Sequence, residues 1–351
     1  MLIEQAIFTS TQSDRMDGYQ LAVHSAGIAD VDLRELTIWG PSHDSLMDSG
    51  DDAVSINFHP LPSGSFCVSK TTPAGREYSG RSGPKIYTQC LIVPPEILAR
   101  FSNNPFALLN AAFAQGSLKV HDPLPEQLEP FRLAGKSSAV DQALLMQLFA
   151  DPGAAWLGVL VEAALRGTTL ALIAGDHGIR LISGIINCLP LECRAAFSFC
   201  TGLKQSPRRP FRIVCLGDDP NEQRRVLRQQ DLTVLELAGR PPQQFMSVDG
   251  WSGLVALTIA SGKTAFLAQE LAKPRPGLLP ADLEELGNQL LEVLAEQVQV
   301  GDGNPSECEA EPVGTAARAA EEAVQADAAH PARPRLAPPA DDQHRADAAH
   351  L

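Results

Sequence analysis

Short apolar segments alternate with turn-forming residues through the first third of the chain. Between Gly, Pro, Ser and Asp positions, β-branched and aromatic side chains recur, which predicts strands over residues 3–9, 19–24, 54–59, 65–69 and 86–93. Helical spacing of apolar side chains predicts helices over 32–39, from 96 onward and over 106–113. We therefore expect an α+β N-terminal domain over residues 1–120.

Residues 121–137 break this pattern, with prolines at 123, 125 and 130 and few periodic apolar positions. Such a composition is typical of an extended connection and predicts a Pro-rich linker.

Helices and strands alternate through residues 138–300. Ser138 and Asp141 resemble a capping box that would start a helix, and Ser247 is placed to cap another that runs from 250 toward 271. Further helices are predicted over 154–165, over 179–189 and from 280, and strands over 170–174, 195–200, 211–216 and 232–237. This order predicts a mixed α/β second domain.

The character of the chain changes after residue 300. Residues 301–351 contain 15 Ala and 6 Pro but no Ile, Met, Phe, Trp or Tyr. Because so few large apolar side chains cannot offset the entropy cost of ordering, we predict a disordered tail.

Charge and processing signals narrow the setting. The chain has 42 acidic and 28 basic residues, a net charge of −14, which disfavours nucleic acid as a primary partner. The N-terminus has no secretory signal pattern, and Glu162 and Asp176 interrupt the longest apolar segments, so no membrane span is expected. Seven cysteines without a C-x-x-C pair fit reduced thiols. These features predict a cytoplasmic protein that needs no metal or cofactor.

Two sequence patterns resemble catalytic or nucleotide motifs without meeting their requirements. Ser42, His43 and Asp44 are consecutive, so their side chains diverge and predict a turn rather than a hydrolase triad. The segment 261–264, Ser-Gly-Lys-Thr, lacks the earlier glycine of a phosphate-binding loop and predicts a polar break within a helix.

The turn Gly175-Asp176-His177-Gly178 lies between a predicted strand and a predicted helix. Many α/β proteins place ligand-binding groups at this position. The turn itself also favours Gly and Asp, with Asp176 as a helix cap, and we prefer this conformational interpretation.

Two groups of residues are candidates for binding. Tyr19, His59, Tyr78, Arg81 and Tyr87 could line a cleft in the first domain, because such side chains orient ligands. Lys204, Arg208, Arg209 and Arg212 form a basic cluster that could hold an acidic partner, or could be a solvated loop. His59 as a base for a Cys90 nucleophile is the alternative, enzymatic hypothesis, although Cys90 lies in an apolar strand.

Several motifs resemble one bacterial family. Five segments of the first 91 residues carry the resemblance: Ile-Glu-Gln-Ala-Ile-Phe in the N-terminal segment, Met-Asp-Gly-Tyr-Gln-Leu at 16–21, Trp-Gly-Pro-Ser-His at 39–43, Asn-Phe-His-Pro-Leu at 57–61 and Tyr-Thr-Gln-Cys-Leu at 87–91. Together they resemble the N-terminal domain of GTPase-associated protein 1. The second half of the chain is similar to the middle domain of that family. The similarity lies in Leu-Pro at 189–190, Arg194, Ser-Phe at 198–199, Thr-Gly-Leu-Lys at 201–204 and Arg-Pro-Phe-Arg at 209–212.

The resemblance implies an accessory or adaptor protein of a GTPase-centred bacterial conflict or defence system, acting by protein–protein interaction with a partner GTPase. It transfers no catalytic residues. A hydrolase with a His/Cys site in the N-terminal domain and a scaffold without a small-molecule site remain the alternatives.

Overall fold

The computed structural model describes residues 2–12, 17–48, 50–76, 83–166, 169–229 and 231–301, with side chains described as far as 296. Residues Met1–Val298 form one compact unit. The predicted disordered tail, apart from Gly301, lies outside the described residues.

Within the described residues, nine strands form the sheet: β1 (Glu4–Thr11), β2 (Gly18–His24), β3 (Ser55–Pro60), β4 (Phe66–Arg76), β5 (Pro84–Val93), β6 (Thr169–Ile173), β7 (Phe199–Cys200), β8 (Ile213–Leu216) and β9 (Leu232–Glu236). The α-helices are α1 (Asp30–Trp39), α2 (Pro95–Arg100), α3 (Pro105–Ala114), α4 (Gln142–Ala150), α5 (Ala154–Leu165), α6 (Gly178–Asn187), α7 (Pro220–Leu227), α8 (Gly250–Ala260), α9 (Thr264–Ala272) and α10 (Leu283–Gly301).

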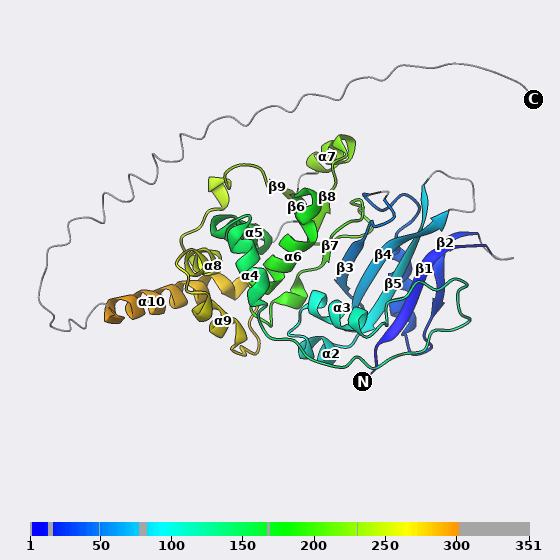
Figure 1. Cartoon of the computed structure of the whole chain (residues 1–351), viewed down its shortest axis with the longest axis horizontal. Coiled ribbons are helices and arrows are strands. Elements are labelled where there is room, and N and C mark those ends of the chain that lie inside the picture. The colour runs from blue at the N-terminus through cyan, green and yellow to red at the C-terminus, as the bar shows by residue number, and fades with distance from the viewer. Residues whose placement is uncertain are drawn as a thin grey trace, which may run out of the picture. The chain divides into compact units, whose positions relative to one another are not determined.

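The strands are joined in one mixed sheet with the order β2-β1-β5-β4-β3-β7-β8-β6-β9 (Figure 1). The first five strands in this order are antiparallel, and β7, β8, β6 and β9 are parallel. The antiparallel pair β3–β7 connects the two halves through Asn57 opposite Cys200 and Phe58 opposite Phe199. Residues far apart in the chain therefore share one hydrogen-bonded ladder.

Helices cover both faces of this sheet. One face packs against helices α2–α6 and α8–α10 in a large apolar core that includes Phe58, Leu91, Phe199 and Leu172. The other face is covered by α1, whose Leu36 packs on the antiparallel strands, and by α7 beside the parallel strands. These layers confirm the predicted fold class, an α+β N-terminal part followed by a mixed α/β part.

The division into two domains stays a prediction. Residues 121–137, the predicted linker, contain no helix or strand, and Phe131 makes a single bridge to Ile3. The sheet nevertheless continues from one half to the other.

Arg194 ties several of these segments together from within the core. Its side chain is fully buried, and the guanidinium donates hydrogen bonds to the carbonyl oxygens of Leu189 (2.9 Å), Ser102 (2.9 Å), Ala139 (2.7 Å) and Asn187 (3.3 Å). Two of these carbonyls follow α6 or end it, where a cation also interacts favourably with the helix dipole. Burial lowers the pKa of Arg194 to about 10, so the group keeps its charge at neutral pH.

Some local predictions were wrong. Only Phe199–Cys200 is a strand in the segment 195–200, because residues 194–196 form a 3₁₀ turn from which the Arg194 side chain enters the core. The carboxylate of Asp141, rather than the Ser138 hydroxyl, accepts the hydrogen bond that caps α4. The helix predicted over 250–271 is two helices, α8 and α9, and the polar break at 261–262 is confirmed.

Further corrections concern helix starts in the second half. Asp249 occupies the position before α8, where we expected Ser247, and His177 rather than Asp176 precedes α6. Helix α7 was missed, although Pro220 in its first turn and the cap Asp219 are recognisable start signals.

Within the described residues, no single helix is long and apolar enough to cross a membrane. Together, α4 and α5 have the length and apolar composition of a membrane span, but the chain bends by 112° at the break between them.

Candidate functional site

The face of the sheet under α1 carries a buried hydrogen-bond network. The Ser55 hydroxyl donates to the side-chain oxygen of Asn57 (2.8 Å), and the Asn57 amide donates to the Ser69 hydroxyl (3.2 Å). The hydroxyls of Thr71 and Thr88 lie 2.9 Å apart on the next strands. All five side chains are buried, and because they follow the period of two along β3, β4 and β5, they lie on one face.

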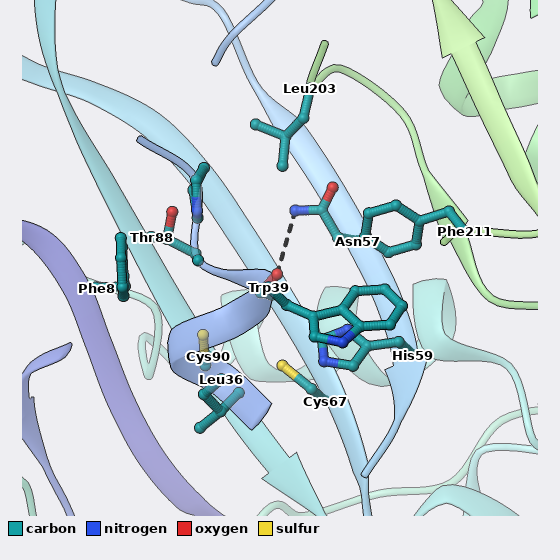
Figure 2. Close-up of a pocket in the computed structure, with 13 residues that line it drawn as sticks. Phe8, Leu36, Trp39, Asn57, His59, Cys67, Thr88, Cys90, Leu203 and Phe211 are labelled. Carbon is teal, nitrogen blue, oxygen red and sulfur yellow. Dashed lines mark hydrogen bonds between the residues drawn. The ribbon is translucent and has the colours of Figure 1, made fainter. Parts of the chain in front are cut away.

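His59 is next to this network at the edge of a small chamber (Figure 2). The Trp39 indole stacks on the His59 imidazole with ring centroids 4.0 Å apart and planes 8° apart. Phe211, from the second half of the chain, packs edge-on against Trp39 at 4.8 Å. The chamber has a volume of about 20 Å³, close to the space that one water molecule needs.

The environment of His59 argues against general-base chemistry. Its side chain is 3% exposed, and neither ring nitrogen has a hydrogen-bond partner within the described residues. Burial lowers the pKa of His59 to about 3, so the imidazole is neutral and a poor proton acceptor at neutral pH.

Two thiols face the same chamber. Cys67 lies opposite His59 in the β3–β4 ladder, and Cys90 lies on β5 (Figure 2). A hydrogen bond with Cys90, together with burial, raises the pKa of the Cys67 thiol. A neutral imidazole beside a protonated thiol lacks the ion pair that activates a cysteine nucleophile, and a chamber of this volume has no room for a substrate.

The three predicted cleft residues that the structure describes, Tyr19, His59 and Tyr87, do not converge on one opening. Tyr19 accepts a hydrogen bond from the backbone N–H of Ile86 (3.0 Å) and packs on the same face as His59. Tyr87 is on the opposite face, where its hydroxyl accepts from the N–H of His121 (3.3 Å). Tyr78 and Arg81 lie outside the described residues.

The four cations of the basic cluster have different surroundings. Lys204 pairs with Asp44 at 2.8 Å, and Arg209 is 8% exposed and donates to the Lys204 carbonyl (2.9 Å). Arg212 lies over the Phe197 ring at 4.1 Å and donates to the Ala164 carbonyl. Arg208 alone of the four is exposed and has no side-chain partner within the described residues.

Trp39 and Phe211 were not among the candidate residues, although both line the chamber. Trp39 was predicted only as a helix position, and Phe211 as the start of a strand. Asn57 and His59 lie on one face of β3, as the period of two along a strand dictates, and both line the chamber.

The fold and this site define a mixed α/β protein with a small chamber between α1 and the antiparallel strands of its sheet. Residues 2–130 match the family described as GTPase-associated protein 1, N-terminal domain type 2. This finding confirms the predicted family for the N-terminal part, while the resemblance of residues 138–300 to a middle domain stays a prediction. No curated protein matches the chain.

Proposed function

We propose that this protein is a cytoplasmic accessory component of a GTPase-centred bacterial conflict or defence system and acts by binding a partner GTPase. The match of residues 2–130 to a GTPase-associated family carries the proposal. The small His59 chamber favours a binding role over hydrolysis, because its buried imidazole and the buried Cys67 thiol lack the exposure and ionisation that nucleophilic catalysis needs.

The experiment is capture of a bacterial GTPase, chosen from the genes that adjoin this one. The full chain is immobilised, and the GTPase is applied without nucleotide, with GDP or with a non-hydrolysable GTP analogue. We expect retention that differs between nucleotide states, since an accessory protein that responds to the GTPase must distinguish them. Equal absence of binding in all three states would refute the proposal, and an unrelated GTPase is the control.

Arg208 is the residue of the basic cluster best placed to contact an acidic partner surface. Because Arg209 is buried and bonded to a backbone carbonyl, reversing its charge would disturb the fold, whereas Arg208→Glu changes an exposed side chain. We expect Arg208→Glu to weaken capture and the matched exposed change Arg240→Glu to leave it intact. Equal capture by both variants removes the basic cluster from the interface.

A further inference from the structure

The carboxyl ends of the parallel strands border a crevice that neither the family match nor the proposed function uses. Its volume is about 350 Å³, within the range of small-molecule pockets. Its walls come from four segments: the turn after β6, the segment after β7, the end of β8 with the residues that follow it, and positions 47, 48, 50 and 52–54 of the N-terminal part. Both halves of the chain therefore build it.

The crevice lies at the point where the connections of two neighbouring strands diverge. Strands β6 and β8 are adjacent and parallel. The helix after β6, α6, packs in the large core on one face through Leu181, whereas the helix after β8, α7, packs on the other face through Val226. In open parallel sheets, ligands bind outside the carboxyl ends of strands at such a switch point.

Glycines leave the backbone bare at the mouth of the crevice. Gly175 follows β6 with φ of +49°, and open space surrounds the position that a Cβ would take. Gly217 follows β8 and also lines the crevice. The turn 175–178, for which we preferred a conformational interpretation from the sequence, lines this crevice through Gly175, Asp176 and Gly178.

The charge of the lining selects the ligand. The crevice is lined by four carboxylates, Asp48, Asp52, Asp176 and Asp218, and by no lysine or arginine among its described lining residues. None of the four takes part in an ion pair within the described part of the chain. The start of α6 can account for Asp176, since helix N-termini favour acidic residues. Asp48 and Asp52 belong to a loop, so no helix N-terminus accounts for an acidic residue at either position.

The carboxylates are spread too widely for a metal ion. Across the described residues, no group of three or more His, Cys, Asp or Glu side chains is spaced to hold one. A ligand that meets several of these carboxylates at once must therefore be larger than an ion and carry positive charge at more than one point or over an extended group.

We propose that this crevice binds a small organic cation with an ammonium or guanidinium group. The cation lies between positions 52–54 and the turns after β6 and β8, with its charge against the carboxylates and its carbon chain against Met47 and Ile179. Occupancy adds contacts between the two halves of the chain directly beside the β3–β7 pair, since Val54 precedes β3 and Thr201 follows β7.

Binding is tested on the full chain alone, so the result is independent of the GTPase partnership. Agmatine and spermidine are titrated by calorimetry at constant ionic strength, beside magnesium chloride, inorganic phosphate and a short arginine peptide with blocked ends. We expect one saturable site for agmatine or spermidine. Binding only of magnesium, only of phosphate or only of the peptide would overturn the proposal.

A double variant locates the site. Asp52→Asn with Asp218→Asn removes one charge from each of two walls, and both side chains are exposed, so folding should be preserved. We expect an affinity loss of about tenfold or more. The matched control, Glu126→Gln with Asp231→Asn, removes the same net charge from exposed positions outside the crevice. Equal losses in both variants would show nonspecific attraction to an acidic protein and refute the site.

Discussion

Replacing Arg194 with Met should destabilise the protein more than any other single change of a charged residue that we describe. Met has a similar length and fills much of the same space, so the lost packing is small. The change leaves four main-chain carbonyls, those of Ser102, Ala139, Asn187 and Leu189, without the guanidinium. The cost is therefore mainly that of unpaired buried acceptors.

The magnitude follows from those four bonds. A buried polar group left without its partner costs about 1–3 kcal/mol, but removal of the buried charge also relieves its own desolvation. We expect a net loss of about 4 kcal/mol in the free energy of unfolding for Arg194→Met. Arg194→Lys, whose ammonium has three donors and no planar fork, should lose about 2 kcal/mol.

Equilibrium unfolding in urea, followed by tryptophan fluorescence, measures both values. Trp251 is a suitable reporter because it is buried and its indole N–H donates to the Cys188 carbonyl close to the Arg194 cluster. Arg208→Met, at an exposed position, is the control and should stay within about 0.5 kcal/mol of the parent protein. A loss below about 1 kcal/mol for Arg194→Met would refute the reasoning.

Two further predictions concern the chamber and a helix crossing. The pKa of His59 falls from 6.5 in the unfolded chain to about 3 in the fold. Between these values only the unfolded state binds a proton at His59, so the free energy of unfolding decreases as the pH falls. The stabilisation by the neutral imidazole is complete above about pH 6.5, and about 2 kcal/mol of it is lost by pH 5. Urea unfolding at pH 8 and pH 5 measures this loss of unfolding free energy. The loss should be about 2 kcal/mol smaller for His59→Phe than for the parent protein, and unchanged for the exposed control His177→Gln. An equal loss in the parent protein and in His59→Phe would contradict the prediction. At the crossing of α8 and α10, a Cβ on Gly287 would lie 2.0 Å from the Gly250 carbonyl carbon, so Gly287→Ala should lower the thermal midpoint, although alanine favours helices. Exposed Glu292→Ala should leave that midpoint unchanged, and a stabilised Gly287→Ala protein would show that the helices can separate without cost.

The sequence predicted most elements because their signals are local. Alternation along β3 and β5 and the helix patterns of α5 and α10 need no knowledge of distant residues. The strand predicted over 195–200 was wrong for most of its length. The buried guanidinium of Arg194 donates to carbonyls from distant parts of the chain, and these contacts determine the conformation of the segment. Tertiary contacts of this kind override the apolar pattern of a short segment.

The candidate site was only partly predictable for a related reason. The period of two placed Asn57 and His59 together, but whether Tyr87 faces the same side depends on the register of β5 against β1 and β4. In the basic cluster, the sequence does not show that two of the cations make contacts inside the protein. Arg209 donates to a backbone carbonyl, and Arg212 lies over an aromatic ring. Charge density along the chain is therefore a poor measure of charge on the surface.

The two-residue seam between β3 and β7 also sets an order for synthesis. Strands β1 to β5 are complete once residue 93 has left the ribosome, but β3 finds its outer neighbour only after residue 200. During that interval the nascent sheet presents the backbone of Asn57 and Phe58 as an open edge, which is the kind of surface that recruits chaperones or pairs with another chain. A shortened protein that ends near residue 130 would keep that edge permanently.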